Sequence, residues 1–209
     1  MGKATDTRQR MIDGARDLIR RNGFGSTSLK DVWEYTGTPR GSVYFHFPGG
    51  KEEIGLEVLQ AVANRLVHLT RLTSSRTRTV ETFIRGVAKA LADELEASGY
   101  LDSCAVVAIS SEVSSVSPTL RAASASALEA WSSSLALELQ RKGIAGEEAG
   151  PLAGVVVSGL EGARVVAKAI SSREPLENMG DALASLPAVA QRRADRPVRS
   201  RPAPRAVRA

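Results

Sequence analysis

The stretch Thr38-Pro-Arg-Gly-Ser-Val-Tyr-Phe-His-Phe-Pro-Gly-Gly-Lys51 indicates the fold of this chain more directly than any other part of the sequence. Thr38 is a good N-cap and Pro39 is preorganised for a first helical position, so we expect a very short helix that exposes its first turn. The amphipathic segment before it, residues 28–36, ends at Gly37, which suits a tight turn. Two helices joined in this way form a helix-turn-helix, whose second helix enters the major groove of DNA.

Helical periodicity on both sides of this stretch predicts an all-α chain of about nine helices. Aromatic residues make up 4% of the chain, and Ala, Leu, Val and Ser dominate its middle, which suits packed helices better than a sheet. Residues 104–112 are apolar enough for a strand, but a lone strand would leave its backbone unpaired, so we expect a short buried helix. The expected helices cover residues 6–22, 28–37, 38–47, 51–72, 80–97, 104–112, 118–142, 147–171 and 175–186.

The distribution of charge divides the chain into three parts. Residues 1–51 carry nine Lys or Arg and five Asp or Glu, residues 52–190 carry twelve and seventeen, and residues 191–209 carry seven and one. The basic head suits contact with phosphates, although a solvated charge imbalance would give the same count. The Arg/Pro-rich tail has too few apolar residues to fold, and we expect it to be disordered. We predict a DNA-binding domain over 1–51 and a helical domain over 52–190.

Composition excludes several classes of protein and site. The single cysteine, Cys104, rules out an intramolecular disulfide and a usual cysteine zinc site, and it fits a reducing cytoplasm. No apolar run approaches the roughly 18 residues that span a bilayer, and acids interrupt the N-terminal segment where a signal peptide would be apolar. With two histidines, no glycine-rich phosphate loop and no acid pair at metal spacing, we expect no enzyme, metal or cofactor.

Small residues recur along one face of the helix expected over 147–171. Glycine destabilises a helix by about 1 kcal/mol relative to alanine, so its repetition calls for a packing reason. The face would allow close approach of another helix, either within the chain or across a subunit interface. Its predicted members are Gly154, Val155, Ser158, Gly162 and Val166.

The order of these motifs resembles the TetR family of bacterial transcriptional regulators. The resemblance is densest from Met11 to Leu59 and is carried by Gly23-Phe, Thr27-Ser-Leu-Lys-Asp-Val, the Thr36 to Phe47 stretch and Lys51-Glu-Glu. Cys104-Ala-Val-Val-Ala, following Gly99-Tyr100, together with Glu161-Gly-Ala is similar to an LmrA/YxaF-like subgroup. The preceding Asp102-Ser103 departs from that subgroup's pattern, as Glu34-Tyr35 departs from the family's usual small residues before the glycine.

The resemblance implies that the third helix reads DNA. Arg40 is the expected base reader, because a guanidinium can donate two hydrogen bonds to a guanine edge. Tyr44, His46 and Lys51 match positions that hold phosphates. Alternatives stay open: His46 as a capping residue, Tyr44 as a core residue, Arg40 as a solvated arginine and Ser28 as an N-cap alone. The implied DNA contacts are Thr27, Ser28, Lys30, Thr38, Pro39, Arg40, Gly41, Ser42, Tyr44, His46 and Lys51.

The resemblance further implies a homodimer that represses from a palindromic operator until a small apolar effector binds the second domain. Soft and aromatic residues in the matching helices are the expected pocket lining, although each could be ordinary core. They are Phe83, Tyr100, Cys104 and Trp131. The alternative function is a sequence-indifferent architectural DNA binder, which the Arg-rich tail would suit.

Overall fold

The computed structural model describes residues 2–113 and 117–194, which form nine helices and no strand. The predicted all-α class is confirmed. The helices are α1 (Gly2–Asn22), α2 (Leu29–Thr36), α3 (Arg40–His46), α4 (Gly50–Ser75), α5 (Val80–Ala97), α6 (Ala105–Val113), α7 (Pro118–Arg141), α8 (Gly146–Ile170) and α9 (Glu174–Ala194).

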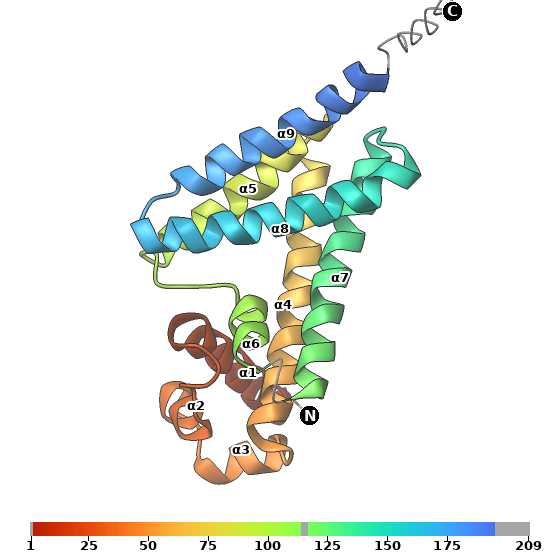
Figure 1. The fold of residues 1–209 in the computed structure, drawn as a ribbon. Helices are drawn as coiled ribbons and strands as arrows, with labels where there is room; N and C mark the ends of the chain where they lie inside the picture. Colours follow the sequence, from red (N-terminus) through yellow and green to blue (C-terminus); the bar gives the residue numbers. More distant parts are fainter. Residues whose placement is uncertain (1, 114–116, 195–209) are drawn as a thin grey trace, which may run out of the picture.

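Two long helices connect the two ends of the molecule. Helices α4 and α7 pack side by side along most of their length (Figure 1). The small helices α1 to α3 lie at one end of this pair, and α5, α8 and α9 pack together at the other end. Helix α6 lies between these groups and contacts α1, α4 and α7, so it is placed to connect the two ends.

Local sequence signals account for α2. The Ser28 hydroxyl accepts a hydrogen bond from the Asp31 amide at 3.2 Å, and the Asp31 carboxylate accepts one from the Ser28 amide at 2.7 Å, which is a capping box. This hydrogen bonding to Ser28 lowers the pKa of Asp31. At the other end, Gly37 has a φ of 63°, a left-handed conformation that favours glycine.

The expected start of α3 is wrong by one residue. Pro39, not Thr38, is the N-cap, and Arg40 is the first helical residue. Thr38 is 5% exposed, and its hydroxyl lies 2.8 Å from the Thr36 hydroxyl, so it is engaged in the turn instead of capping the helix. Sequence preference for an N-cap was overridden by packing of the turn.

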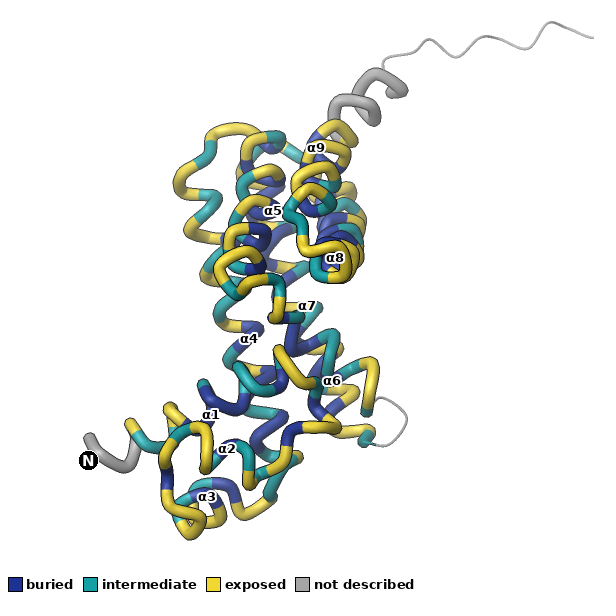
Figure 2. The backbone as a smooth tube through the Cα atoms, turned by 90° about the vertical axis from the view of Figure 1, so that its left-hand side faces the viewer, coloured by how far each residue is buried: buried dark blue, intermediate teal, exposed yellow. Residues whose placement is uncertain are grey.

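Two buried side chains attach α3 to the rest of the fold. Val43 and Phe47, four residues apart on one helical face, are fully buried, and the Arg8 guanidinium lies 5.0 Å from the Phe47 ring centroid. Phe45, between them in sequence, is 78% exposed. In Figure 2, α3 lies at one end of the molecule and contains both buried and exposed positions.

Several boundaries differ from expectation. Helix α1 begins at Gly2 instead of residue 6, α4 continues to Ser75, and α9 continues to Ala194 instead of ending near residue 186. Residues 191–194, predicted to belong to a disordered tail, are therefore helical, and the remainder of that predicted tail lies outside the described residues. No helix within the described ranges is long and apolar enough to cross a membrane.

Replacement of Phe47 by alanine is expected to destabilise the protein by about 3–5 kcal/mol, because it removes a buried ring and leaves a cavity under α3. Phe45→Ala is the matched control, and we expect it to change stability by less than about 0.5 kcal/mol. Urea unfolding followed by circular dichroism measures both. Equal losses in the two variants would contradict the proposed anchoring of α3.

Candidate DNA-binding site

The outward face of α3 presents chemically distinct groups close together. Pro39, Arg40, Gly41, Tyr44 and Phe45 are exposed. A side chain added at Gly41 would meet no atom within 4 Å, so the backbone here is open to close approach. The face therefore combines a cation, a bare backbone segment and two aromatic rings, a combination suited to a groove of DNA.

Arg40 lies near two aromatic rings. Its guanidinium carbon is 5.8 Å from the Trp33 ring centroid and 5.9 Å from that of Tyr44. These contacts place the Arg40 side chain between α2 and α3. None of the described residues forms an ion pair with the Arg40 guanidinium. Arg40 thus retains its hydrogen-bond donors for an external acceptor.

The other predicted contacts fall into two groups. Lys30 and Ser28 are exposed on α2 and its cap, and Lys30 lies 3.7 Å from Glu34. Ser42 and His46 are half-buried on α3. Thr27, by contrast, is buried and donates a hydrogen bond to the Gly23 carbonyl at 2.7 Å. The structure does not present Thr27 or the buried Thr38 at the surface, because both close the turns that flank α2.

Lys51 packs against the turn between α1 and α2. Its amine donates a hydrogen bond to the Gly25 carbonyl at 2.9 Å and lies 4.6 Å from the Phe24 ring centroid. Burial lowers the pKa of Lys51, with Glu112 acting in the opposite direction. Lys51 therefore ties the start of α4 to the first turn of the head, in addition to any contact with phosphate.

Sequence reasoning missed Glu112 at the end of α6. Its carboxylate accepts hydrogen bonds from the amides of Phe24, at 3.2 Å, and Gly25. A side chain added at Gly25 would lie 2.8 Å from this carboxylate, so the carboxylate would have to shift to make room for it. Lys51 and Glu112 hold the same turn through its carbonyl and amide groups, which fixes the head against α6.

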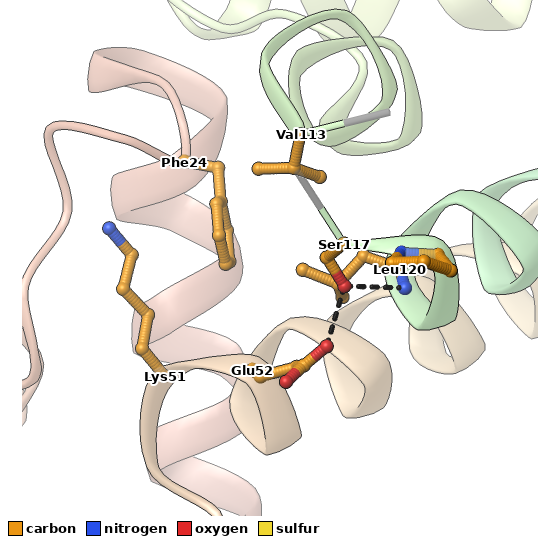
Figure 3. Close-up of a pocket in the computed structure, with 7 residues that line it drawn as sticks. Phe24, Lys51, Glu52, Val113, Ser117 and Leu120 are labelled. Carbon is orange, nitrogen blue, oxygen red and sulfur yellow. Dashed lines mark hydrogen bonds between the residues drawn. The ribbon is translucent and has the colours of Figure 1, made fainter. Parts of the chain in front are cut away.

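A hollow of about 480 Å³ lies beside this turn, between the head and α7 (Figure 3). The Phe24 ring and Lys51 form one side, and Val113 and Leu120 form the other. The Ser117 hydroxyl donates to Glu52 at 2.5 Å and accepts from the Leu120 amide at 3.1 Å, which links α4 to the start of α7. None of the predicted effector-pocket residues lines this hollow.

The predicted effector residues lie on different elements of the fold, and their role as a pocket lining stays a prediction. Phe83 is buried on α5 and Trp131 is buried on α7. Cys104 is buried just before α6, and Tyr100 is half-buried in the loop after α5. The Trp131 indole N–H has no hydrogen-bond partner among the described residues. Cys104 lines a small cavity with several arginines. Phe83 and Trp131 are fully buried, as expected of ordinary core residues.

The small-residue face of α8 points away from the rest of the chain. A side chain added at Gly154 or Gly162 would meet no atom within 4 Å, whereas one at Gly159 would meet Met179 of α9 at 3.1 Å. Val155 and Val166 are each 50% exposed. Packing among the described residues therefore does not explain Gly154 and Gly162, and an apolar outward face is left on α8.

Two family descriptions match the chain. Residues 11–58 match "Bacterial regulatory proteins, tetR family", and residues 81–182 match "Transcriptional regulator LmrA/YxaF-like, C-terminal domain". The uncharacterised regulator YxaF of Bacillus subtilis is 26% identical over 82% of this chain and 90% of its own length. LmrA of the same organism is 23% identical over 87% of this chain and 96% of its own length. A TetR regulator structure from Legionella pneumophila has a TM-score of 0.75, with 20% identity over 85% of this chain and 95% of that one.

Cys104 is expected to resist alkylation in the folded protein. Burial raises the pKa of its thiol to about 12, and the nearby Glu161 acts in the same direction. At pH 8 the reactive thiolate should then be roughly a thousandfold rarer than in the unfolded chain. Iodoacetamide labelling followed by mass spectrometry, with and without urea, measures the difference. Equal rates in both conditions would show that Cys104 is accessible and ionised.

Proposed function

Because the chain belongs to the TetR family of bacterial transcriptional regulators, which bind DNA through a helix-turn-helix and are not enzymes, we propose that it is a repressor released from a palindromic operator by a small molecule. The observation that carries the proposal is the exposed face of α3, where Arg40 stands beside the bare backbone of Gly41. We place its action in the cytoplasm, where bacterial DNA lies.

In this proposal, Arg40 reads a guanine. Its guanidinium donates two hydrogen bonds to the guanine edge in the major groove, a contact worth about 1–3 kcal/mol of discrimination. Gly41 lets the helix backbone approach the bases, and the exposed Phe45 ring offers an apolar surface for a thymine methyl group. Sequence preference would therefore come from the first turn and the outer face of α3.

Phosphate contacts would set the register of the head without carrying sequence information. Tyr44 is exposed on α3, and Lys30 and Ser28 are exposed at the start of α2, so phosphates on either side of the groove are within the reach of separate elements. His46 and Lys51 are less exposed and would add contacts at the end of α3 and the start of α4. These contacts would make affinity fall as salt concentration rises.

We propose that the outward face of α8 is the dimer interface. It presents Val155, Ser158 and Val166 with the bare backbones of Gly154 and Gly162 between them, and Leu186 of α9 is 40% exposed. A two-fold dimer buries the same face of both chains and places two copies of α3 on one DNA duplex. Its operator is then palindromic, with half-sites set by the separation of the two α3 helices.

The response to an apolar effector would pass through α6. This helix contacts α4 and α7 in the body, and Glu112 at its end holds the turn of the head. A ligand in the body that favours a different position of α6 would change the orientation of the head, and a few kcal/mol of differential affinity would be sufficient.

Arg40→Ala is expected to weaken binding to the preferred operator by about 10- to 100-fold and to relax preference at one base pair of each half-site. Duplexes selected from a random pool supply the operator, and fluorescence anisotropy at physiological salt measures affinity against a scrambled duplex. Arg71→Ala, at an exposed position of α4 away from the head, is the matched control. Equal weak binding of the wild type to both duplexes would instead support an architectural binder.

Val166→Asp is expected to convert the dimer to monomers at micromolar concentration, because it places a charge in the apolar centre of the proposed interface. Sedimentation velocity measures the change, and operator affinity should fall with it. Leu101→Asp is the control, since Leu101 is also exposed but lies in the loop after α5. A Val166→Asp protein that remains dimeric would place the interface elsewhere.

A further inference from the structure

A group of arginines lies where α1, α4 and α8 meet the start of α6. Arg16 and Arg20 of α1, Arg65 of α4 and Arg164 of α8 line one small cavity of about 10 Å³. Its remaining lining includes the apolar side chains of Val62 and Leu66 and the segment 103–105, and no described carboxylate lines it. Arg164 is the buried member of the group, and a buried charge is costly unless it is paired.

The neighbouring carboxylates pair with three of these arginines and leave Arg164 without a close partner. Arg20 and Arg21 share Asp102, at 3.2 and 3.4 Å. Arg65 donates to both oxygens of Glu94, and Arg164 lies 3.9 Å from the same carboxylate. Arg16 pairs with Asp13 at 2.8 Å and with Asp17 at 3.2 Å. Four guanidinium groups, those of Arg20, Arg21, Arg65 and Arg164, thus share the two carboxylates of Asp102 and Glu94.

The remaining acid in this region is Glu161. It is buried on α8, one helical turn before Arg164, and interacts with the Cys104 thiol. Burial raises the pKa of Glu161, with Arg164 acting in the opposite direction. Burial likewise lowers the pKa of Arg20, and the charges of Arg164 and Arg65 act with it while Asp102 opposes them. The arginines therefore repel one another across the cavity.

Arg164 gives the independent indication of a ligand. Its side chain is 4% exposed, it lines the cavity, and its Nε–H has no hydrogen-bond partner among the described residues. The 3.9 Å separation from Glu94 is longer than a hydrogen bond. A buried guanidinium with an unused donor is strongly destabilising by itself, and an oxyanion within its reach would satisfy it.

We propose that this cavity binds the carboxylate of an amphipathic carboxylic acid, and that this acid is the effector. Arg164 and Arg20 donate to the carboxylate oxygens, in the planar geometry that suits guanidinium and carboxylate groups. Val62 and Leu66 contact the first carbons of the acid. The proposal rests on the repressor function proposed above and replaces a purely apolar effector with one that carries a single negative charge.

The size of the cavity connects binding to α6. About 10 Å³ is room for a single water, so a carboxylate enters only if the lining moves, and the start of α6 is part of that lining. That start is held by Ser103, whose amide and hydroxyl donate to the Arg20 carbonyl at 2.8 and 2.7 Å, while Arg20 Nε donates to the Ser103 carbonyl at 3.2 Å. A carboxylate that attracts the Arg20 guanidinium competes with this last bond and loosens α6 from α1.

The test uses sodium octanoate and its neutral isostere octanamide on the full chain, at constant ionic strength. Isothermal titration calorimetry should detect octanoate binding and no comparable octanamide binding. Arg164→Met should weaken octanoate binding about tenfold or more, and Arg164→Lys, which keeps the charge, should fall between this variant and the wild type. Arg71→Met, which removes an exposed arginine of α4, should bind as the wild type does. Circular dichroism confirms that each variant is folded.

Equal binding of octanamide, or undiminished octanoate binding by folded Arg164→Met, would overturn the carboxylate site. Operator binding is measured separately by anisotropy, first without octanoate and then with it. Wild-type protein that binds its operator but not octanoate would refute the carboxylate site and leave the DNA-binding function standing. Arg164-dependent octanoate binding by a protein that selects no operator would support the site and refute the repressor. Octanoate binding that leaves operator affinity unchanged would refute its role as effector.

Discussion

The arrangement of this protein depends on how the turn between α1 and α2 satisfies its backbone. The amides of Phe24 and Gly25 point toward α6 and need acceptors, and the Glu112 carboxylate supplies them. The Gly25 carbonyl on the same turn accepts from Lys51 of α4. These bonds add to the polar contacts that Arg8, Arg20 and Arg21 of α1 make with the body. The orientation of α3 is thus set by groups from α4 and α6, outside the helix-turn-helix.

The exposed chemistry of α3 follows from its anchoring. Val43 and Phe47 bury one face, and a helix of seven residues then has no freedom to rotate, so Arg40, Gly41 and Tyr44 must face outward. Arg40 is further placed by the rings of Trp33 and Tyr44. The reading face is therefore a consequence of which residues are buried, and it is rigidly coupled to the turn that Glu112 and Lys51 hold.

Sequence predicted what is local and missed what is distant. The capping box of Ser28 and Asp31, the left-handed Gly37 and the helical periodicity depend on neighbours within four residues, and each is present. Thr38 was misassigned because burial beside Thr36 replaced its capping role. Glu112 could not be found from spacing, since 87 residues separate it from Gly25. Its signal was only a single acid near the end of a short helix that begins with apolar residues.

The arginines around the small cavity illustrate the same limit and add a physical constraint on any effector response. Arg20, Arg65 and Arg164 are separated by dozens of residues, so their convergence appears only after α1, α4 and α8 pack together. In this poorly solvated place the charges of Arg164 and Arg65 disfavour the charged form of Arg20. An anion that relieves the repulsion stabilises whichever position of α6 gives it room. Ser103 attaches the start of α6 to α1, and Glu112 attaches its end to the turn between α1 and α2. A change in the position of α6 therefore acts on the head.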